Sequence, residues 1–387
     1  MNIVKKLSPH SGRLERWLGS DRIETLAKQM REGGGPRSRW YGPPIHLLDV
    51  PGAIMITGDG DFVGNFPRGF YHSAADSLRD HLRRLWTKAG KPIYINDAVF
   101  GANSGGFATI SAALARASAG NKYAFLWKKD GPTGVAGVAS TLWRVGATPA
   151  AGAAPGAAPG GTATDDSTTG AQPFTNPSSG FLHLTGADFS ASVVNNALLL
   201  YDRLFHVLKT MNSTTTEAVS GVPTRYQSQT STDQDYIGGN FLFIEVGGTA
   251  LANTGHNWTT CLYTDEGGNS STLPSVTGNA AAIVDRLDMP AGNWFCPLAT
   301  GDIGIKALTQ MQCSAAVATG VINFVIGHPL GFMVFPLAST IIPFDWFTNR
   351  DQVPRVFNDA CRALLEMPKP TTTATIYTGI NYELSAA

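Results

Sequence analysis

The spacing of apolar positions is helix-like in four stretches of this chain. Apolar residues recur every three or four positions over 187–211, which predicts one long central helix. Shorter helices are expected at 73–89, 107–118 and 351–366, where Leu, Ala and Val occupy one face. A further helix over about 21–33 begins at the capping residue Asp21, and its apolar stripe is narrow.

The remaining apolar runs are of strand length, and most lie after residue 222. The expected strands are 45–57 (two short ones), 92–99, 122–128, 135–145, 241–247, 258–263, 321–326, 332–342 and 373–382. The two patterns together predict an α+β fold. We expect mixed helices, mainly antiparallel sheet, a sheet-rich C-terminal half, an extended N-terminal arm and the long central helix.

One apolar stretch is long enough to cross a membrane. No Asp, Glu, Lys or Arg lies between Lys306 and Asp345, and 315–344 is strongly apolar. Glycine and proline divide it into pieces of strand length. The pattern therefore favours buried strands joined at Gly327-His328-Pro329 over a transmembrane helix.

Composition changes divide the chain into four parts. We expect a basic arm at 1–44, a mixed α/β part at 45–145, a loop or linker at 146–180 and a domain with the long helix and the sheet at 181–387. The 146–180 segment is rich in Gly, Ala and Pro and has few bulky side chains to bury. It is therefore expected to be mobile or to be ordered only by other chains.

Charge is distributed unevenly between the arm and the rest. Residues 1–39 hold nine basic and four acidic side chains, a net charge of +5, whereas 91–387 hold 15 basic and 20 acidic, a net charge of −5. The nine basic residues are the candidate contacts to another subunit or to phosphate: Lys5, Lys6, Arg13, Arg16, Arg22, Lys28, Arg31, Arg37 and Arg39. An arm of one copy could dock on the body of the next, which predicts salt-sensitive assembly.

Overall composition also indicates association. Only 15% of residues are charged, where about 25% is usual, and the net charge is zero. Uncharged polar clusters such as NSTTT at 212–216 are then expected to cover much of the surface, and such a surface suits a subunit enclosed by neighbours. The alternative is a β-rich soluble domain with long loops.

Cysteine usage and the N-terminus indicate a reducing compartment. Cys261, Cys296, Cys313 and Cys361 are widely spaced without a Cys-x-x-Cys pair, so buried thiols are expected. The basic N-terminal residues lack the apolar core of a secretory signal, so we expect synthesis and retention in the cytoplasm.

Candidate catalytic and metal-binding motifs are few. GANSGG at 101–106 resembles the surroundings of a trypsin-like nucleophile, Ser104, but only four histidines precede it, and a Gly-rich turn explains it better. Asp59 and Asp61 have the spacing that begins a Ca²⁺ loop, without the later Gly and Glu. We expect no catalytic residue, metal or cofactor.

The order of these features resembles tailed-bacteriophage virion structural proteins. The shared features are a basic arm, a mixed first part, a Gly/Ala/Pro-rich excursion, a long helix and a charge-poor sheet-rich half that includes 293–329. The resemblance implies a capsid-shell subunit in which 187–211 is the spine helix and 146–180 the extended loop. The order departs from that fold, because about 100 residues separate the arm from the loop. A decoration, collar or tail subunit therefore stays open.

The first hypothesis is a self-assembling subunit of a virus particle, located in the virion, with many copies of itself as partners. Other virion proteins, or non-specific contact with packaged nucleic acid, are further partners, and no membrane is expected. The second hypothesis is a serine hydrolase that uses Ser104. The third is a carbohydrate- or receptor-binding module in which Trp258, Tyr263 and Trp294 form an exposed aromatic platform, against the alternative that they pack in the core.

Overall fold

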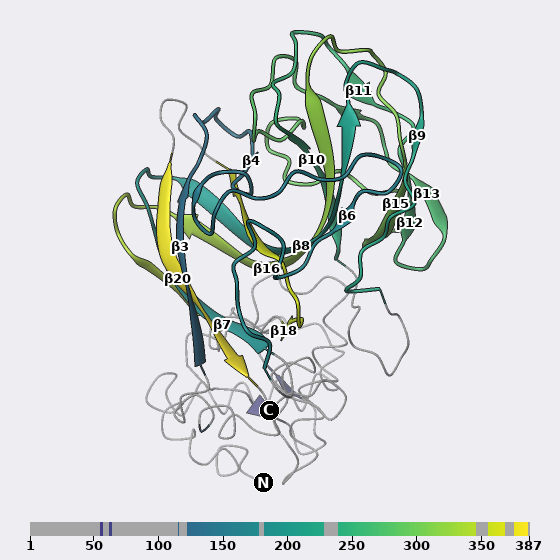
Figure 1. Cartoon of the computed structure of the whole chain (residues 1–387). Helices are drawn as coiled ribbons and strands as arrows, with labels where there is room; N and C mark the ends of the chain where they lie inside the picture. Colours follow the sequence, from purple (N-terminus) through teal and green to yellow (C-terminus); the bar gives the residue numbers. More distant parts are fainter. Residues whose placement is uncertain are drawn as a thin grey trace, which may run out of the picture. The chain divides into compact units, whose positions relative to one another are not determined.

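A computed structural model describes residues 122–177, 182–227, 239–345, 355–367 and 375–385, together with 55–56, 62–63 and 115. The chain divides into two units, Met1–Tyr94 and Ile95–Ala387. In the first unit, β1 (Met55–Ile56) and β2 (Phe62–Val63) form an antiparallel pair. All other strands belong to the second unit (Figure 1).

The predicted α+β fold with a long helix is wrong, because the described residues form strands and no helical element. In place of the helix at 187–211 the chain forms β7 (Leu182–Ala191), a turn, and β8 (Asn196–Thr210). Asn195 makes the turn with φ at 59°, a left-handed conformation that Asn tolerates. Because β8 is buried on both faces, its apolar run lacks the alternation that identifies a strand.

The helix expected at 351–366 is also replaced by strands. β18 (Arg355–Val356) and β19 (Arg362–Met367) lie on either side of a turn in which Asp359 has φ of 61°. Five of the six residues of β19 are buried, including the charged Arg362 and Glu366, so its burial does not alternate either. Burial on both faces hides the period of two here as it does in β8.

The central sheet carries the strands around which the second unit is built. Its order is β10 (Phe241–Val246), β16 (Val321–Phe335), β8, β19 and β4 (Ser140–Thr141), and β6 (Thr162–Ala163) also pairs with β8. Neighbouring strands are antiparallel, as predicted for the C-terminal half. β8 and β16 pair along 15 residues each, and both are interrupted by register shifts on either side of Gly327-His328-Pro329.

The apolar stretch at 315–344 is strand, as predicted, but Gly327-His328-Pro329 does not divide it. β16 runs through these residues, and the expected break is a pair of bulges. β17 (Ile342–Asp345) then follows. Among the residues that the structure describes, no helix is long and apolar enough to cross a membrane.

A second antiparallel sheet packs against one face of the central sheet. Its order is β17, β7, β20 (Ile376–Ser385), β3 (Lys122–Asp130) and β5 (Ala147–Thr148), with β18 also paired to β7. The core between the two sheets, here the small core, includes Trp127, Phe189 and Tyr377 from this sheet and Leu200 and Met333 from the central sheet. The two sheets therefore form a sandwich.

The opposite face of the central sheet contributes to a larger core. Tyr201, Phe205 and Phe324 lie in this large core together with Trp258 and Tyr263. Two further sheets surround the large core. One consists of β9 (Glu217–Ala218), β12 (Leu262–Asp265), β13 (Ser270–Thr272) and β15 (Ile305–Met311), and the other of β11 (Asn257–Trp258) and β14 (Val276–Thr277). In Figure 1 these strands form the lobe at the upper right.

Residues 146–177 are ordered by their own chain, which corrects the expectation that they are mobile or held only by other chains. The backbone of 156–164 follows β8, and the amide of Ala158 donates to the carbonyl of Leu208 at 3.3 Å. The amide of Gly152 donates to the carbonyl of Trp143 at 2.7 Å. A β-carbon at Gly152 would lie 2.1 Å from the Trp143 ring, so the small residues let the backbone cover this indole. The four-part division of the chain stays a prediction.

Candidate functional site: a buried ion-pair network

The middle of β8 carries charged side chains where the sheet is most deeply buried. Asp202 and Arg203 have no measurable exposure, and both lie beside the bulge at Gly327. A β-carbon at Gly327 would lie 2.7 Å from Tyr201 and 2.9 Å from Phe241, so this position requires glycine. The close approach brings β10, β16 and β8 together around the two charges.

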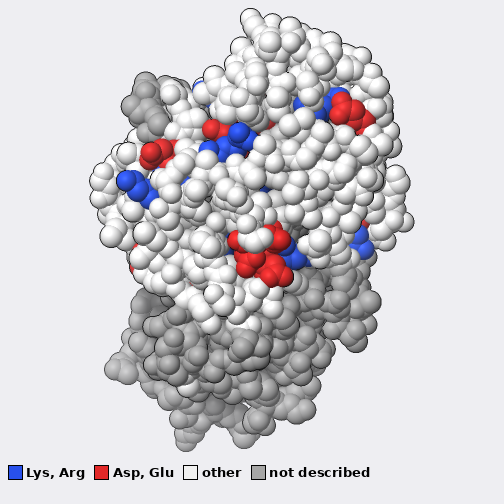
Figure 2. Space-filling model, in the orientation of Figure 1, with Lys and Arg blue, Asp and Glu red and all other residues white. Residues whose placement is uncertain are grey.

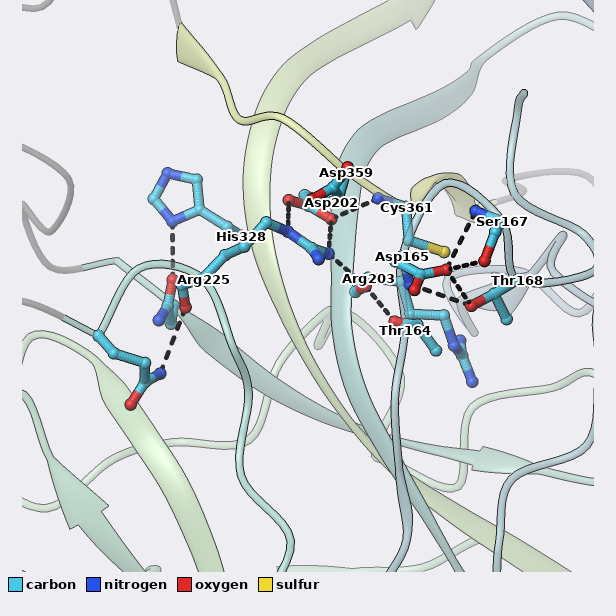
Figure 3. A network of polar contacts seen from close by, with 12 residues as sticks. Thr164, Asp165, Ser167, Thr168, Asp202, Arg203, Arg225, His328, Asp359 and Cys361 are labelled. Atoms are coloured by element: carbon cyan, nitrogen blue, oxygen red, sulfur yellow. Dashed lines mark hydrogen bonds and ion pairs between the residues drawn. The ribbon is translucent and has the colours of Figure 1, made fainter. Parts of the chain in front are cut away.

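Asp202 forms a two-pronged ion pair with Arg225 (Figure 3). The Nε and Nη2 atoms of Arg225 donate to the two carboxylate oxygens at 2.9 and 2.7 Å. The backbone amide of Cys361 donates to Asp202 Oδ1 at 2.9 Å, and Arg225 Nη2 also donates to the carbonyl of Arg203 at 3.3 Å. Burial alone lowers the pKa of Arg225, but the Asp202 carboxylate outweighs it and raises that pKa.

Arg203 points to the other side of β8 and pairs with Glu245 of β10. Its Nη2 and Nη1 atoms donate to the two carboxylate oxygens at 2.7 and 3.2 Å, and both side chains are fully buried. Tyr201 and His206 accept further hydrogen bonds from Arg203 at 3.2 Å each. Burial, reinforced by the neighbouring Arg203 charge, lowers the pKa of His206 to about 2, so its ring is neutral and can accept.

A third buried arginine joins the two sheets of the sandwich. Nη1 of Arg362 in β19 donates to Glu383 Oε1 of β20 at 2.6 Å, and both side chains are fully buried. The guanidinium lies 3.8 Å from the ring centroid of Phe125 and 4.1 Å from that of Phe174. Asn381 donates to the same Glu383 oxygen at 2.9 Å. This cluster fixes the spacing of the two sheets in the small core.

The rim of the network is acidic and more exposed. Asp165 Oδ1 accepts hydrogen bonds from Ser167 Oγ at 2.7 Å and from Thr168 Oγ1 at 3.0 Å. Partial burial, with the nearby Asp359 and Asp165 charges, raises the pKa of Asp166. Among the described residues no group of three His, Cys, Asp or Glu side chains is placed to hold a metal ion.

The groups of the network hold the strands in place by ion pairs and hydrogen bonds. Burial raises the pKa of the Cys361 thiol to about 12, so the thiol stays protonated and unreactive. Burial lowers the pKa of His328 to about 3, and its ring stacks on Tyr226 with centroids 3.9 Å apart. The paired guanidiniums stay charged at any physiological pH. These groups orient four strands of the central sheet and are not arranged to transfer a proton.

The described residues include one of the four sets of candidates predicted from sequence. Trp258 and Tyr263 are fully buried and Trp294 is partly buried, so the exposed aromatic platform is wrong and core packing is correct. The nine basic residues from Lys5 to Arg39 lie outside the described residues, and so do Ser104 and Asp59 with Asp61. The four cysteines are free and buried, as predicted.

The ion-pair network was missed by the sequence analysis, although a signal for it was present. Each charge interrupts an otherwise apolar run: LLLYDRLF at 198–205, FLFIEV at 241–246 and CRALLEM at 361–367. Charged side chains within such runs are rarely buried unless they are paired. The runs could have indicated buried ion pairs, but they do not show which charge pairs with which.

Comparison with known proteins identifies no family. No family model matches the chain, and no curated protein matches it. Some solved structures resemble the chain weakly, and one is the infectious bursal disease virus VP2 subviral particle. The two sequences are 8% identical, and the match covers 68% of this chain and 80% of that chain with a TM-score of 0.15.

Two further structures from the same virus give similar values. The Gt strain structure has 9% identity and a TM-score of 0.16, covering 68% of this chain and 80% of its own. The virus-derived T=1 particle has 9% identity and a TM-score of 0.16, covering 68% and 77%. All three come from a virus and two are particles, but at TM-scores this low the likeness establishes neither fold nor function, and it does not concern tailed bacteriophages.

Proposed function

We propose that this chain is a self-assembling structural subunit of a virus particle, without a catalytic role of its own. The finer form of the proposal is a tailed-bacteriophage capsid protein, located in the virion after synthesis in the host cytoplasm. Its main partner is then many copies of itself.

The observation that carries the proposal is the placement of charge. Among the residues that the structure describes, eleven charged side chains are buried, although the chain has few charges to begin with: Lys129, Asp202, Arg203, Lys209, Arg225, Glu245, Asp265, Asp288, Arg362, Glu366 and Glu383. On the face drawn in Figure 2, Lys, Arg, Asp and Glu occupy only small patches. The described part of this face is thereby left largely uncharged, which lowers the cost of covering it with neighbouring subunits.

Exposed apolar side chains support the same reading. In the described part of the chain eleven large apolar residues are exposed, including Ile341 at 67%, Ile303 at 64%, Leu337 at 56% and Leu126 at 55%. Subunit interfaces are depleted in charge and enriched in apolar area at their centres. A subunit enclosed by copies of itself would bury these residues.

The internal network suits a subunit whose shape must persist. The pairs Asp202–Arg225, Arg203–Glu245 and Arg362–Glu383 join segments far apart in sequence, and each pair is buried. Removing one partner of a buried pair costs about 3–5 kcal/mol, so distortion that separates a pair is opposed strongly. The contacts between copies are proposed to come from the basic arm at 1–44 and from exposed loops.

Electron microscopy of the purified full-length protein tests the proposal. We expect regular particles or sheets at low ionic strength and fewer of them at high ionic strength. A variant with Arg13, Arg16 and Arg22 replaced by Glu should lose them. The matched control is Lys128→Glu, which reverses an exposed basic residue of β3 and should leave assembly intact. Nuclease treatment before imaging separates docking between subunits from contact with nucleic acid, because only the latter is abolished.

A protein that stays monomeric at high concentration, and behaves identically after the three Arg→Glu changes, would contradict the proposal. If assembly persists in those variants, the proposal that the chain is a structural subunit stands, but the proposal that the arm makes the contacts is wrong.

A further inference from the structure

His256 lies in the lobe formed by the large core, at a junction of three segments. It precedes β11, its side chain is fully buried, and its carbonyl accepts from the amide of Gly278 at 3.0 Å. The ring packs closely on Gly278, where a β-carbon would lie 2.2 Å from Nε2. The third segment is 285–289, which supplies Asp288.

Both nitrogens of the His256 ring face acceptors. Nε2 lies 2.8 Å from Asp288 Oδ2, and Nδ1 lies 3.0 Å from the carbonyl oxygen of Thr254. A carbonyl oxygen has no proton to give, so Nδ1 must carry one. A neutral ring would then turn the lone pair of Nε2 toward a carboxylate oxygen, which is repulsive. The contacts of Nδ1 with Thr254 and of Nε2 with Asp288 are both favourable only if a further proton lies between Nε2 and the carboxylate.

The proton belongs to His256 because the surroundings of Asp288 favour its ionised form. Its Oδ2 also accepts from the Trp258 indole at 2.8 Å, and its Oδ1 accepts from the Asn279 amide at 2.6 Å. Hydrogen bonds donated to a carboxylate stabilise the charge. The other titratable groups near this carboxylate are the thiols of Cys296 and Cys313, which burial keeps protonated by raising the pKa of each.

We propose that His256 is a proton-dependent latch: as an imidazolium bound to Asp288 it holds together the segments 254–258, 276–279 and 285–289, and it releases them when it loses its proton. Asn279 extends the latch, because its side-chain amide donates to the carbonyls of Leu287 and Met289 at 3.0 and 2.5 Å. The latch is a property of the single chain and does not depend on the proposed assembly.

The sign of the pH dependence follows from the contacts of His256. Burial opposes the charge, but the hydrogen bond and charge of Asp288 outweigh it, and the pKa of His256 in the folded chain is raised. A raised folded pKa means that the latch contributes fully below the unfolded value of about 6.5. The contribution is lost as pH rises through the folded value, so the lobe loosens on the alkaline side.

Nuclear magnetic resonance of the His256 ring nitrogens in the full chain tests the latch. We expect both nitrogens to be protonated below pH 6.5, and Nε2 to lose its proton only above pH 6.5 while Nδ1 keeps its own. His328, whose pKa burial lowers to about 3, is the internal control and should stay neutral across the same range. A ring that has already lost the Nε2 proton below pH 6.5 would overturn the proposal.

Hydrogen exchange supplies the second readout. The opening constant for the amides of Gly278 and Asn279, corrected for intrinsic exchange, should rise by up to about tenfold for each pH unit between about 6.5 and the folded pKa of His256, and level off above it. In Asp288→Asn the pKa of His256 should fall below 6.5 and this pH dependence should disappear. Protection that is independent of pH in the unaltered protein would also overturn the latch, so the test does not require that the variant fold.

Discussion

Replacing Glu245 by Gln removes one charge from the centre of the buried network while keeping the shape of the side chain. Arg203 would then remain fully buried without its carboxylate partner. The two charge-assisted hydrogen bonds, at 2.7 and 3.2 Å, are worth about 1.5–3 kcal/mol each. Breaking a buried pair by changing one partner costs about 3–5 kcal/mol. We therefore expect Glu245→Gln to lower the free energy of unfolding by about 3–5 kcal/mol.

Urea denaturation followed by tryptophan fluorescence measures this loss. The buried Trp143 ring serves as the probe, because its centroid lies 4.8 Å from the Arg203 guanidinium. The matched control is Asp130→Asn, the same chemical change at an exposed residue at the end of β3, for which we expect a change within about 0.5 kcal/mol. The double variant Arg203→Met with Glu245→Leu should be more stable than Glu245→Gln alone, since it leaves no unpaired charge. A loss below about 1 kcal/mol for Glu245→Gln would refute the reasoning.

Three further predictions concern the cores. Gly327→Ala should destabilise the fold by about 1–3 kcal/mol in thermal or urea unfolding, because the new methyl group would lie 2.7 Å from Tyr201. Burial raises the pKa of Glu366 to about 8, above its unfolded value, so its contribution to stability is present at low pH and is lost as pH rises from about 4.5 toward 8. Glu366→Gln should accordingly improve stability more at pH 8 than at pH 4.5, and an equal effect at both would contradict the assignment. The four buried cysteines should resist a thiol reagent in the native protein and react after denaturation, whereas rapid native reaction would show that the cores are open.

The sheet-rich half of the chain was predictable where strands alternate or are bounded by turn residues. β10, β16 and β20 lie where the apolar runs indicated, as does β3 in the first half. β8 and β19 were not predictable in this way, because each is covered on both faces and its apolar residues do not alternate with polar ones. A continuous apolar run fits the helical period and the strand period equally. The turn at Asn195, set by a left-handed backbone, decides between them.

The network could be predicted only in part. The sequence marks Asp202, Arg203 and Arg362 as charges within apolar runs, but their partners lie 21 to 42 residues away in the chain. Pairing depends on strand order, and the helix predicted over 187–211 gave the wrong order. The packing of 146–177 was missed for a related reason: its small residues bury little themselves, but they cover Trp143 and follow β8.

Sedimentation velocity of the full-length protein, across a range of protein and salt concentrations, tests the central claim of self-assembly most directly. The account predicts a concentration-dependent shift from subunits to large discrete assemblies, reversed by salt because the +5 arm and the −5 body attract each other. A single monomeric species at every concentration and ionic strength would contradict it.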